Sequence, residues 1–301
     1  MTQWSLDEEP SEVHPGRDAE RSMHAFTDAR RIVAGKAMAP IGVFDSGAGG
    51  LTILSALRRE LPQENYIYIG DTAYCPYGVR SDAEIAALTT NACRFLVEQG
   101  VKIIVIACNT ASQAALNVVR STFDIPFVGV VPAVKPAVRA TKRGRIGVAA
   151  TNQAVKAAYL HHLIEDFAAG VRVYAVGCPE LVTLVERGTL DGPVVEETLH
   201  HVLHPLLSQN IDVLVLGCTH FPAMRSAIEH VAGSNVLVID SGAAVARRTH
   251  AVLDTESLVR PAHANADLGT LNVWCSGEPE AFGNVASKVL GYSVVAQQVL
   301  L

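Results

Sequence analysis

From residue 40 onward, short apolar runs alternate with longer stretches in which apolar residues recur every three or four positions. Most of the short runs are rich in Val and Ile and continuously apolar, which is typical of parallel strands covered on both faces. The alternation of strands and helices predicts an α/β protein. We expect strands at 41–44, 66–69, 103–107, 127–130, 146–149, 172–175, 213–216 and 236–239, and a last one at 292–295.

Three of the longer stretches have clear helix boundaries. Residues 82–98 follow Ser81, a favourable N-cap residue, and end shortly before Gly100. The stretches 193–207 and 279–290 each begin with a proline, which is favoured in the first turn of a helix. We therefore expect helices over these three ranges.

The chain contains an internal repeat at an offset of about 110 residues. The run 102–108 aligns with 212–218, and both copies end in a cysteine. The residues 127–131 align in the same way with 237–241. The repeat predicts two halves of similar topology rather than one large sheet.

We expect two similar, open, mostly parallel-sheet α/β domains that face each other across a cleft as a pseudo-twofold duplication. A length of 301 residues, about twice a typical domain, agrees with this division. The first domain would comprise residues 40–132 together with 241–301, and the second residues 133–240. Residues 1–39 are polar and predict a loose N-terminal extension, in which a short helix around 24–32 fits the sequence.

Composition narrows the function. Acidic residues outnumber Lys plus Arg by 30 to 24, and the net charge of −6 argues against a primary nucleic-acid binder. No apolar run reaches the roughly 18–20 residues of a membrane span. The acidic N-terminal residues lack the apolar stretch of a secretory signal, and six cysteines without a C-x-x-C pair do not form a disulfide scaffold. We expect a cytoplasmic protein with free thiols and no membrane partner.

The strongest chemical signal is the pair of cysteines at matched positions of the repeat. Cys108 and Cys218 each follow a predicted strand and precede polar residues that favour a helix start, with Asn109 or Thr110 as caps in the first copy. A helix N-terminus attracts anions and favours a thiolate, and His220 is close enough in sequence to assist Cys218. Buried packing is the alternative for each cysteine. The matched positions favour two thiols on opposite sides of one cleft.

Two loops after the first and second strands add polar groups at the same sheet edge. The glycine-rich loop that begins with Asp45-Ser46 lacks the Gly-Lys-Ser/Thr of a phosphate-binding P-loop and the third Gly of a dinucleotide fingerprint. A small molecule with a carboxyl group fits this loop better than a phosphate. The later turn Pro76-Tyr77-Gly78 predicts an exposed phenol and amide beside it.

Other polar clusters are weaker candidates. The three histidines of the 193–207 helix lack a completing carboxylate or cysteine, so a solvated helix face is favoured over a metal site; they are His200, His201 and His204. Four basic residues near 139–145 fit an exposed connection better than a nucleic-acid patch. Cys93 lies in the middle of a predicted helix and is expected in the core.

Taken together, four motifs resemble the aspartate/glutamate racemase family over roughly residues 40–300. They are Asp45-Ser-Gly-Ala-Gly-Gly-Leu51, Pro76-Tyr-Gly78, Ala107-Cys-Asn-Thr110 and Gly217-Cys-Thr-His-Phe-Pro222. Aspartate-specific members tend to have Glu after the second Cys-Thr, so His220 favours glutamate as the substrate. The resemblance implies interconversion of L- and D-glutamate, supply of D-glutamate for peptidoglycan, no cofactor or metal, and a homodimer.

The resemblance also implies residue roles. Cys108 would take the α-proton from D-glutamate with help from Asp45, and Cys218 would take it from L-glutamate with help from His220. Each thiol would reprotonate the face that the other has stripped. The residues expected to bind substrate are Asp45, Ser46, Pro76, Tyr77, Gly78, Asn109, Thr110, Thr219 and His220, with Glu186 at the border of the site.

One departure from the family pattern and two alternatives stay open. Family members usually have Ala-Thr-x-Gly-Thr after the Ile-Gly-Val strand, whereas this chain has Ala154 in place of the second Thr, which removes one expected substrate contact. The same fold also fits a related racemase, isomerase or decarboxylase for another small acid. A non-enzymatic binding protein on the duplicated fold is the third hypothesis, and it would tolerate loss of either thiol.

Overall fold

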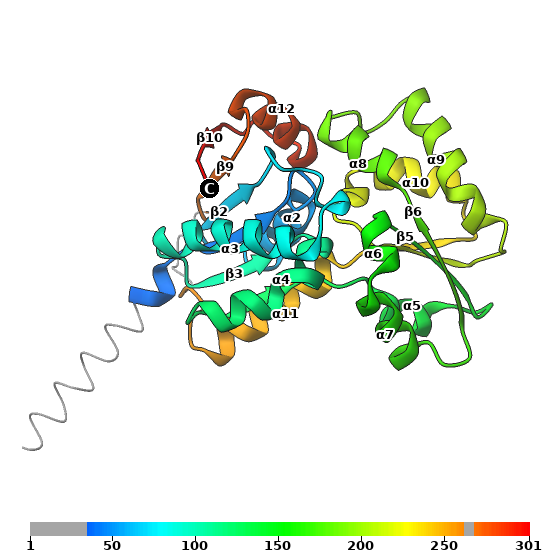
Figure 1. The fold of residues 1–301 in the computed structure, drawn as a ribbon, viewed down its shortest axis with the longest axis horizontal. Helices are drawn as coiled ribbons and strands as arrows, with labels where there is room; N and C mark the ends of the chain where they lie inside the picture. Colours follow the sequence, from blue (N-terminus) through cyan, green and yellow to red (C-terminus); the bar gives the residue numbers. More distant parts are fainter. Residues whose placement is uncertain (1–34, 262–267) are drawn as a thin grey trace, which may run out of the picture.

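The computed structural model describes residues 35–261 and 268–301, so the helix expected around 24–32 lies outside the described residues. Within this part of the chain, ten strands form two separate parallel sheets, as the apolar runs predict. Figure 1 shows the two sheets side by side, each with its own helices. The prediction of an α/β protein with two parallel-sheet units is confirmed.

The first sheet has six strands in the order β10-β9-β2-β1-β3-β4. Its strands are β1 (Ile41–Asp45), β2 (Tyr66–Gly70), β3 (Ile103–Ile106), β4 (Phe127–Gly129), β9 (Leu271–Cys275) and β10 (Ala296–Gln298). All of its pairs are parallel; for example, Val43 of β1 is in register with Tyr68 of β2 and Val105 of β3. Both ends of the described chain thus contribute to this sheet.

Alternate residues along these strands point to opposite faces, and helices cover both. One core contains Ile41 and Val43 with α2, α11 and α12, whereas the other contains Phe44 with α3 and α4. The helices of this half are α2 (Leu51–Glu60), α3 (Asp82–Glu98), α4 (Asn109–Thr122), α11 (Gly242–Thr255) and α12 (Pro279–Leu290), with the 3₁₀ turn η1 (Tyr77–Val79). Cys93 of α3 is fully buried, as expected.

The second sheet has four parallel strands in the order β6-β5-β7-β8. They are β5 (Arg145–Ala150), β6 (Arg172–Gly177), β7 (Val213–Leu216) and β8 (Leu237–Ile239). Helices α5 (Val134–Ala140), α6 (Asn152–Lys156) and α7 (Ala158–Phe167) cover one face. The other face is covered by α8 (Pro179–Glu186), α9 (Pro193–Leu207), the 3₁₀ turn η2 (Phe221–Met224) and α10 (Arg225–Ala232).

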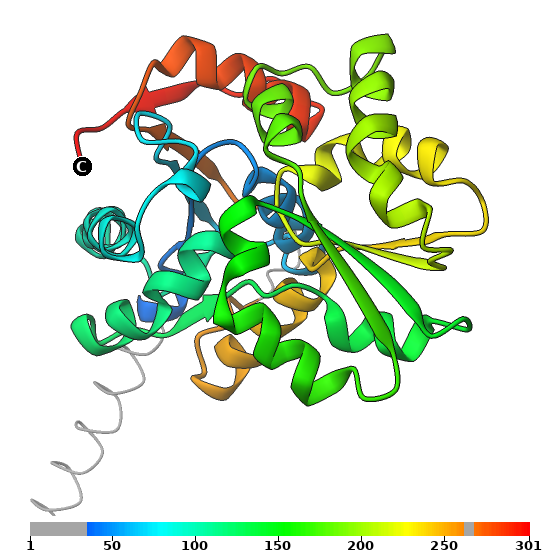
Figure 2. The ribbon, with the colours of Figure 1, turned by 45° about the vertical axis from the view of Figure 1, so that its right-hand side comes forward.

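The two sheets share one topology, which supports the internal repeat. The order β2-β1-β3-β4 in the first sheet corresponds to β6-β5-β7-β8 in the second. Cys108 follows β3 and Cys218 follows β7, so the matched cysteines occupy equivalent positions. The turned view shows α8 and α12 approaching each other at the boundary between the halves (Figure 2).

One strand near the C-terminus is predicted at the wrong residues and another is missed. The last strand, β10, runs over Ala296–Gln298 rather than 292–295, because those earlier residues form the turn back from α12, and Val294 there meets Ser287 of that helix. Strand β9 has no counterpart among the predicted strands. Its residues alternate between buried and more exposed positions, so it lacks the continuous apolar run of a central strand.

The start of α3 agrees with its predicted boundary. Helix α3 begins with a capping box, in which the Ser81 side chain accepts from the backbone N–H of Glu84 and the Glu84 carboxylate accepts from that of Ser81. In the described residues, no helix is long and apolar enough to cross a membrane.

Candidate active site

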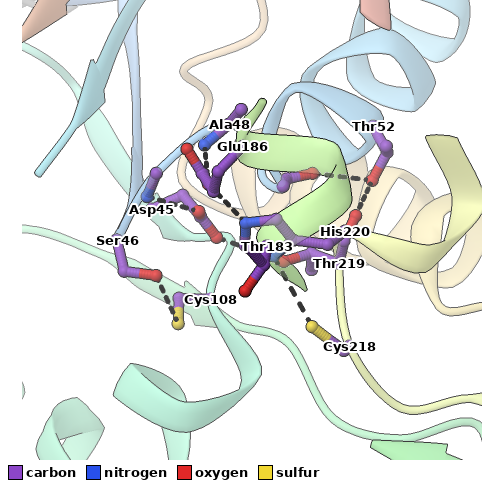
Figure 3. A network of polar contacts seen from close by, with 12 residues as sticks. Asp45, Ser46, Ala48, Thr52, Cys108, Thr183, Glu186, Cys218, Thr219 and His220 are labelled. Atoms are coloured by element: carbon purple, nitrogen blue, oxygen red, sulfur yellow. Dashed lines mark hydrogen bonds and ion pairs between the residues drawn. The ribbon is translucent and has the colours of Figure 1, made fainter. Parts of the chain in front are cut away.

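The central polar groups of the site lie at or just after the carboxyl ends of parallel strands. Asp45 ends β1, Cys108 follows β3, and Cys218 follows β7 of the other sheet. Such strand ends are where open parallel sheets place ligands. Figure 3 shows these residues from both halves gathered around one region.

The glycine-rich loop after β1 lies against two side chains from the second sheet. A Cβ added at Gly47 would lie 2.1 Å from Oε1 of Glu186, and one at Gly49 would lie 2.3 Å from Nδ1 of His220. Only glycine allows such an approach. The backbone N–H of Ala48 donates to Oε1 of Glu186 at 2.7 Å. The glycines therefore serve close contact between the halves.

Cys108 is the N-cap of α4, a role that sequence analysis gave to Asn109 or Thr110. Its Sγ accepts from the backbone N–H of Ala111 at 3.4 Å and lies 3.6 Å from Oγ of Ser46. The cap falls one residue earlier because α4 already begins at Asn109, directly after the cysteine. Burial and the nearby charge of Asp45 raise the pKa of Cys108 to about 12.

Cys218 is the start of a chain of polar contacts. Its Sγ lies 3.5 Å from Nδ1 of His220, whose Nε2 lies 2.5 Å from Oε1 of Glu186 (Figure 3). Burial alone would lower the pKa of His220, but the Cys218 charge and hydrogen bonds to Cys218, Cys75 and Glu186 raise it well above its ordinary value. A protonated His220 stabilises a thiolate at Cys218.

Asp45 is fully buried and lies between the two thiol regions. Its Oδ1 accepts from the backbone N–H of Gly47 at 2.8 Å, and its Oδ2 accepts from Oγ1 of Thr219 at 3.2 Å. Burial raises the pKa of Asp45 despite the opposing charge of His220. A carboxyl group with a raised pKa is a better proton acceptor, and this one lies beside both halves of the site.

The turn of Pro76, Tyr77 and Gly78 differs from its prediction in one respect. The phenol of Tyr77 is buried and donates to Oδ2 of Asp71 at 2.6 Å, so it is not exposed. The buried Asp71 carboxylate needs donors, and it also accepts from Ser276 at 2.6 Å. Pro76 is exposed and Gly78 is half-buried.

Gly78 places this turn against the second half of the molecule. A Cβ on Gly78 would lie 3.1 Å from Cβ of Thr151, the N-cap of α6. Oγ1 of Thr110 lies 3.3 Å from Oγ1 of the same threonine, so α4 also meets α6 there. Ala154, which replaces the usual threonine, is buried and donates its backbone N–H to Oγ1 of Thr151 at 3.1 Å.

Asn109 offers a free polar atom to a ligand. Its Oδ1 is buried and, within the described residues, has no hydrogen-bond partner. Buried polar atoms are nearly always paired, so an unpaired one in a cleft indicates a place for a ligand group. Asn109 lies next to Cys108 at the start of α4.

The structure brings together most of the residues that the sequence singled out. Asp45, Ser46, Cys108, Thr219 and His220 connect through the contacts above, and Glu186 joins them through His220. Each of the histidines at 200, 201 and 204 is exposed on α9 and stays outside this region. The charge of Cys218 reaches Cys108, so the two thiols lie within electrostatic range of each other.

Sequence analysis missed two participants. Thr52 donates from Oγ1 to the backbone carbonyl of Thr219 at 2.8 Å, and nothing in its sequence context signals this contact. Cys75 lies beside Glu186 and His220, and its position next to the Pro-Tyr-Gly turn was the one available signal. Cys75 and Glu186 also line a cavity of about 630 Å³ between α8 and α12.

Comparison with known proteins gives the same family from sequence and from structure. The profile of the Asp/Glu/hydantoin racemase family matches residues 50–249. A glutamate racemase of Deinococcus radiodurans is 48% identical over 249 residues, which cover 77% of this chain and 86% of that protein. One from Herpetosiphon aurantiacus is 44% identical over 82% of this chain and 96% of that protein.

Solved structures agree with this comparison. A crystal structure of Escherichia coli glutamate racemase, in complex with L-glutamate and the activator UDP-MurNAc-Ala, superposes with a TM-score of 0.77. The two chains are 36% identical, and the match covers 87% of this chain and 98% of that one. The fold described above is thus similar to that of a protein solved in complex with L-glutamate.

Proposed function

We propose that this chain, which belongs to the Asp/Glu/hydantoin racemase family, interconverts L- and D-glutamate by proton transfer between the α-carbon and two thiols. The observation that carries the proposal is the placement of Cys108 and Cys218 just after equivalent strands of the two sheets, with Asp45 and Thr219 in contact between them. Glutamate is the substrate because the relatives that match most of the chain are glutamate racemases. His220 after the second Cys-Thr agrees with that substrate.

The two thiols have different helpers. For L-glutamate, Cys218 accepts the α-proton as a thiolate, stabilised by a protonated His220 that Glu186 holds in place. Cys108 then delivers its own proton to the opposite face of the α-carbon. The thiolate left at Cys108 is disfavoured by burial, so the raised pKa of Asp45 suits it to hold or return a proton there.

The substrate is held by groups around the thiols. The free Oδ1 of Asn109 accepts from the α-ammonium, and the start of α4, with Ser46 and Thr110, faces a carboxylate. Thr219 contributes from the other half, and the turn Pro76-Tyr77-Gly78 closes one side. Donors aimed at the α-carboxylate stabilise the negative charge that builds up when the α-proton leaves.

We place the reaction in a cleft between two domains, residues 40–132 with 241–301 and residues 133–240. The D-glutamate formed supplies peptidoglycan synthesis in the cytoplasm, and the working form is a homodimer. Sedimentation velocity of the full chain tests the homodimer, which would be rejected by a single species of monomer mass.

Heavy water tests the two-thiol scheme. Starting from either enantiomer, early product should carry solvent deuterium at the α-carbon while the remaining substrate stays largely unlabelled, because each thiol serves one face. Cys108→Ser and Cys218→Ser should each lose racemisation by a factor on the order of 10³ or more while keeping their far-UV circular dichroism. Full conversion by either variant would overturn the scheme, and turnover of aspartate with glutamate inert would overturn the substrate.

A further inference from the structure

A third thiol stands beside the proposed proton-transfer groups without a role in them. One ligand atom each from Cys75, Glu186 and His220 lie within 4.8 Å of one another. They come from three separate segments, the loop before η1, the end of α8 and the turn after β7. The glycine-rich loop contributes to this closeness, since a Cβ at Gly47 would lie 2.1 Å from Oε1 of Glu186 and 2.9 Å from Sγ of Cys75.

The donor set matches the preference of one class of ion. A thiolate sulfur, an imidazole nitrogen and a carboxylate oxygen together suit a tetrahedral Zn²⁺ with one position left for water. Their charges also fit, because a thiolate and a carboxylate with a neutral imidazole balance a divalent cation. A hard ion such as Mg²⁺ prefers oxygen ligands and is a poor match for this set.

The cluster is accessible to a hydrated ion. Cys75 and Glu186 line the cavity of about 630 Å³ between α8 and α12, whereas His220 lies behind them and is almost fully buried. The Glu186 side chain is 22% exposed. An ion entering through this cavity therefore meets the thiol and the carboxylate before it reaches the imidazole.

We propose that Cys75, Glu186 and His220 bind a divalent transition-metal ion, with zinc preferred, and that the bound ion inhibits racemisation. The ion replaces the proton on the Cys75 thiol and the one on Nε2 of His220, so binding releases protons to solvent. It does not act as a cofactor.

Inhibition follows from what the ion does to His220, and this half of the inference rests on the proposed function. Nε2 of His220 faces Glu186, whereas Nδ1 faces Cys218. Coordination at Nε2 fixes the imidazole to the metal in place of its contact with Glu186. The ring is then held by the ion rather than by the site, so its Nδ1 contact with Cys218 is disturbed even though neither thiol of the pair is a ligand of the ion.

Cobalt absorption tests binding without substrate. Co²⁺ added to the full-length protein should give the near-ultraviolet thiolate-to-metal charge-transfer band and the visible bands of a tetrahedral site, and Zn²⁺ should displace it at one equivalent. The near-isosteric Cys75→Ser should lose the charge-transfer band and weaken Zn²⁺ binding about tenfold or more by calorimetry. Cys93→Ser, which removes a buried thiol in α3, is the matched control and should bind as the wild type does.

Two results would overturn the site. The charge-transfer band surviving in Cys75→Ser but vanishing in Cys218→Ser would place the ion on the Cys218–His220 pair instead. Absence of any thiolate band in the wild type would also reject it. Because these readouts need no turnover, they are independent of whether the protein racemises glutamate.

Racemisation assays then test the inhibition. Wild type and Cys93→Ser should lose activity at Zn²⁺ concentrations near the calorimetric dissociation constant. Cys75→Ser, compared with its own rate without zinc, should need about tenfold more zinc for the same fractional loss. Equal zinc sensitivity of Cys75→Ser and the wild type would overturn the inhibitory role even with the binding site confirmed.

Discussion

Thr219 donates a hydrogen bond of 3.2 Å from Oγ1 to Oδ2 of Asp45, across the boundary between the two sheets. Asp45 is the last residue of β1, and Thr219 follows the thiol that comes after β7. Both side chains are buried, so water does not compete for this contact. This hydroxyl–carboxylate pair is therefore one of the contacts that fix the relative position of the two halves at the site.

Thr219→Val should reduce kcat/KM about tenfold or more, because it removes this contact with little change of shape. The free energy of unfolding should fall by about 1.5–3 kcal/mol, the usual range for a hydrogen bond to a charged group. Thr255→Val is the matched control, since that exposed hydroxyl donates to the carbonyl of Ala251 in its own helix. Steady-state kinetics equal to wild type in Thr219→Val would contradict the coupling.

Asp45→Asn should lower the rate of racemisation and raise the free energy of unfolding at neutral pH. Burial raises the pKa of Asp45 above 3.8, so the folded state favours the protonated form. The protonated Asp45 side chain contributes to the free energy of unfolding, and this contribution is fully present below pH 3.8. It is lost as pH rises through the raised pKa of Asp45, so that at neutral pH the buried carboxylate is charged. Asparagine does not titrate and can still accept from Gly47 and donate to Thr219.

The unfolding free energy of Asp45→Asn, measured in urea, should therefore exceed that of the wild type at pH 7, with the difference shrinking as pH falls toward 3.8. Racemisation should drop by a factor on the order of 10²–10⁴, the usual contribution of a general acid–base group. A variant less stable than the wild type at every pH would show that the carboxylate instead stabilises the fold.

The sequence predicts the continuously apolar strands better than the two C-terminal strands. Buried parallel strands such as β3 and β7 are continuously apolar, and a cysteine follows each two residues later, so strand and thiol were visible together. Strands β9 and β10 at the C-terminus are only partly buried, and their apolar runs are broken. These two strands therefore depend on tertiary pairing that no local pattern encodes.

The sequence predicted the site residues that follow strands, but it did not predict which hydrogen-bond partners the side chains of the site have. Asp45, Cys108 and Cys218 lie at or just after the carboxyl ends of their strands, so their placement followed from the strand pattern alone. The direction of the Tyr77 phenol depends on the buried Asp71, and the approach of Cys75 to His220 depends on a glycine contact between distant segments. Such choices are set by the need to pair buried polar groups, which becomes clear only once the fold is known.

Glu186→Gln should shift the pH dependence of the L-to-D reaction. Hydrogen bonding to Glu186 is one of the causes that raise the pKa of His220, so its loss should lower that pKa. The protonated His220 that supports the Cys218 thiolate is then lost at a lower pH, and the alkaline limb of kcat/KM moves toward acid. At the alkaline end the rate should fall by about tenfold.

Glu229→Gln is the control for this experiment. The Glu229 carboxylate accepts a hydrogen bond from Arg225 and lies outside the site. Its pH profile should match that of the wild type. An alkaline limb that stays in place in Glu186→Gln would show that His220 keeps its proton without this partner.

Lys102→Met should destabilise the fold far from the thiols. Nζ of Lys102 lies 2.5 Å from Oε2 of Glu64, both side chains are almost fully buried, and the same ammonium donates to the carbonyls of Ala37 and Leu258. Removing one partner leaves Glu64 charged and buried, at a cost of about 3–5 kcal/mol in unfolding free energy. The double variant Lys102→Met/Glu64→Gln should recover much of the lost unfolding free energy, as measured by urea denaturation. An equal loss in the single and the double variant would mean that the contacts of Lys102 with the carbonyls, and not its pairing with Glu64, stabilise the fold.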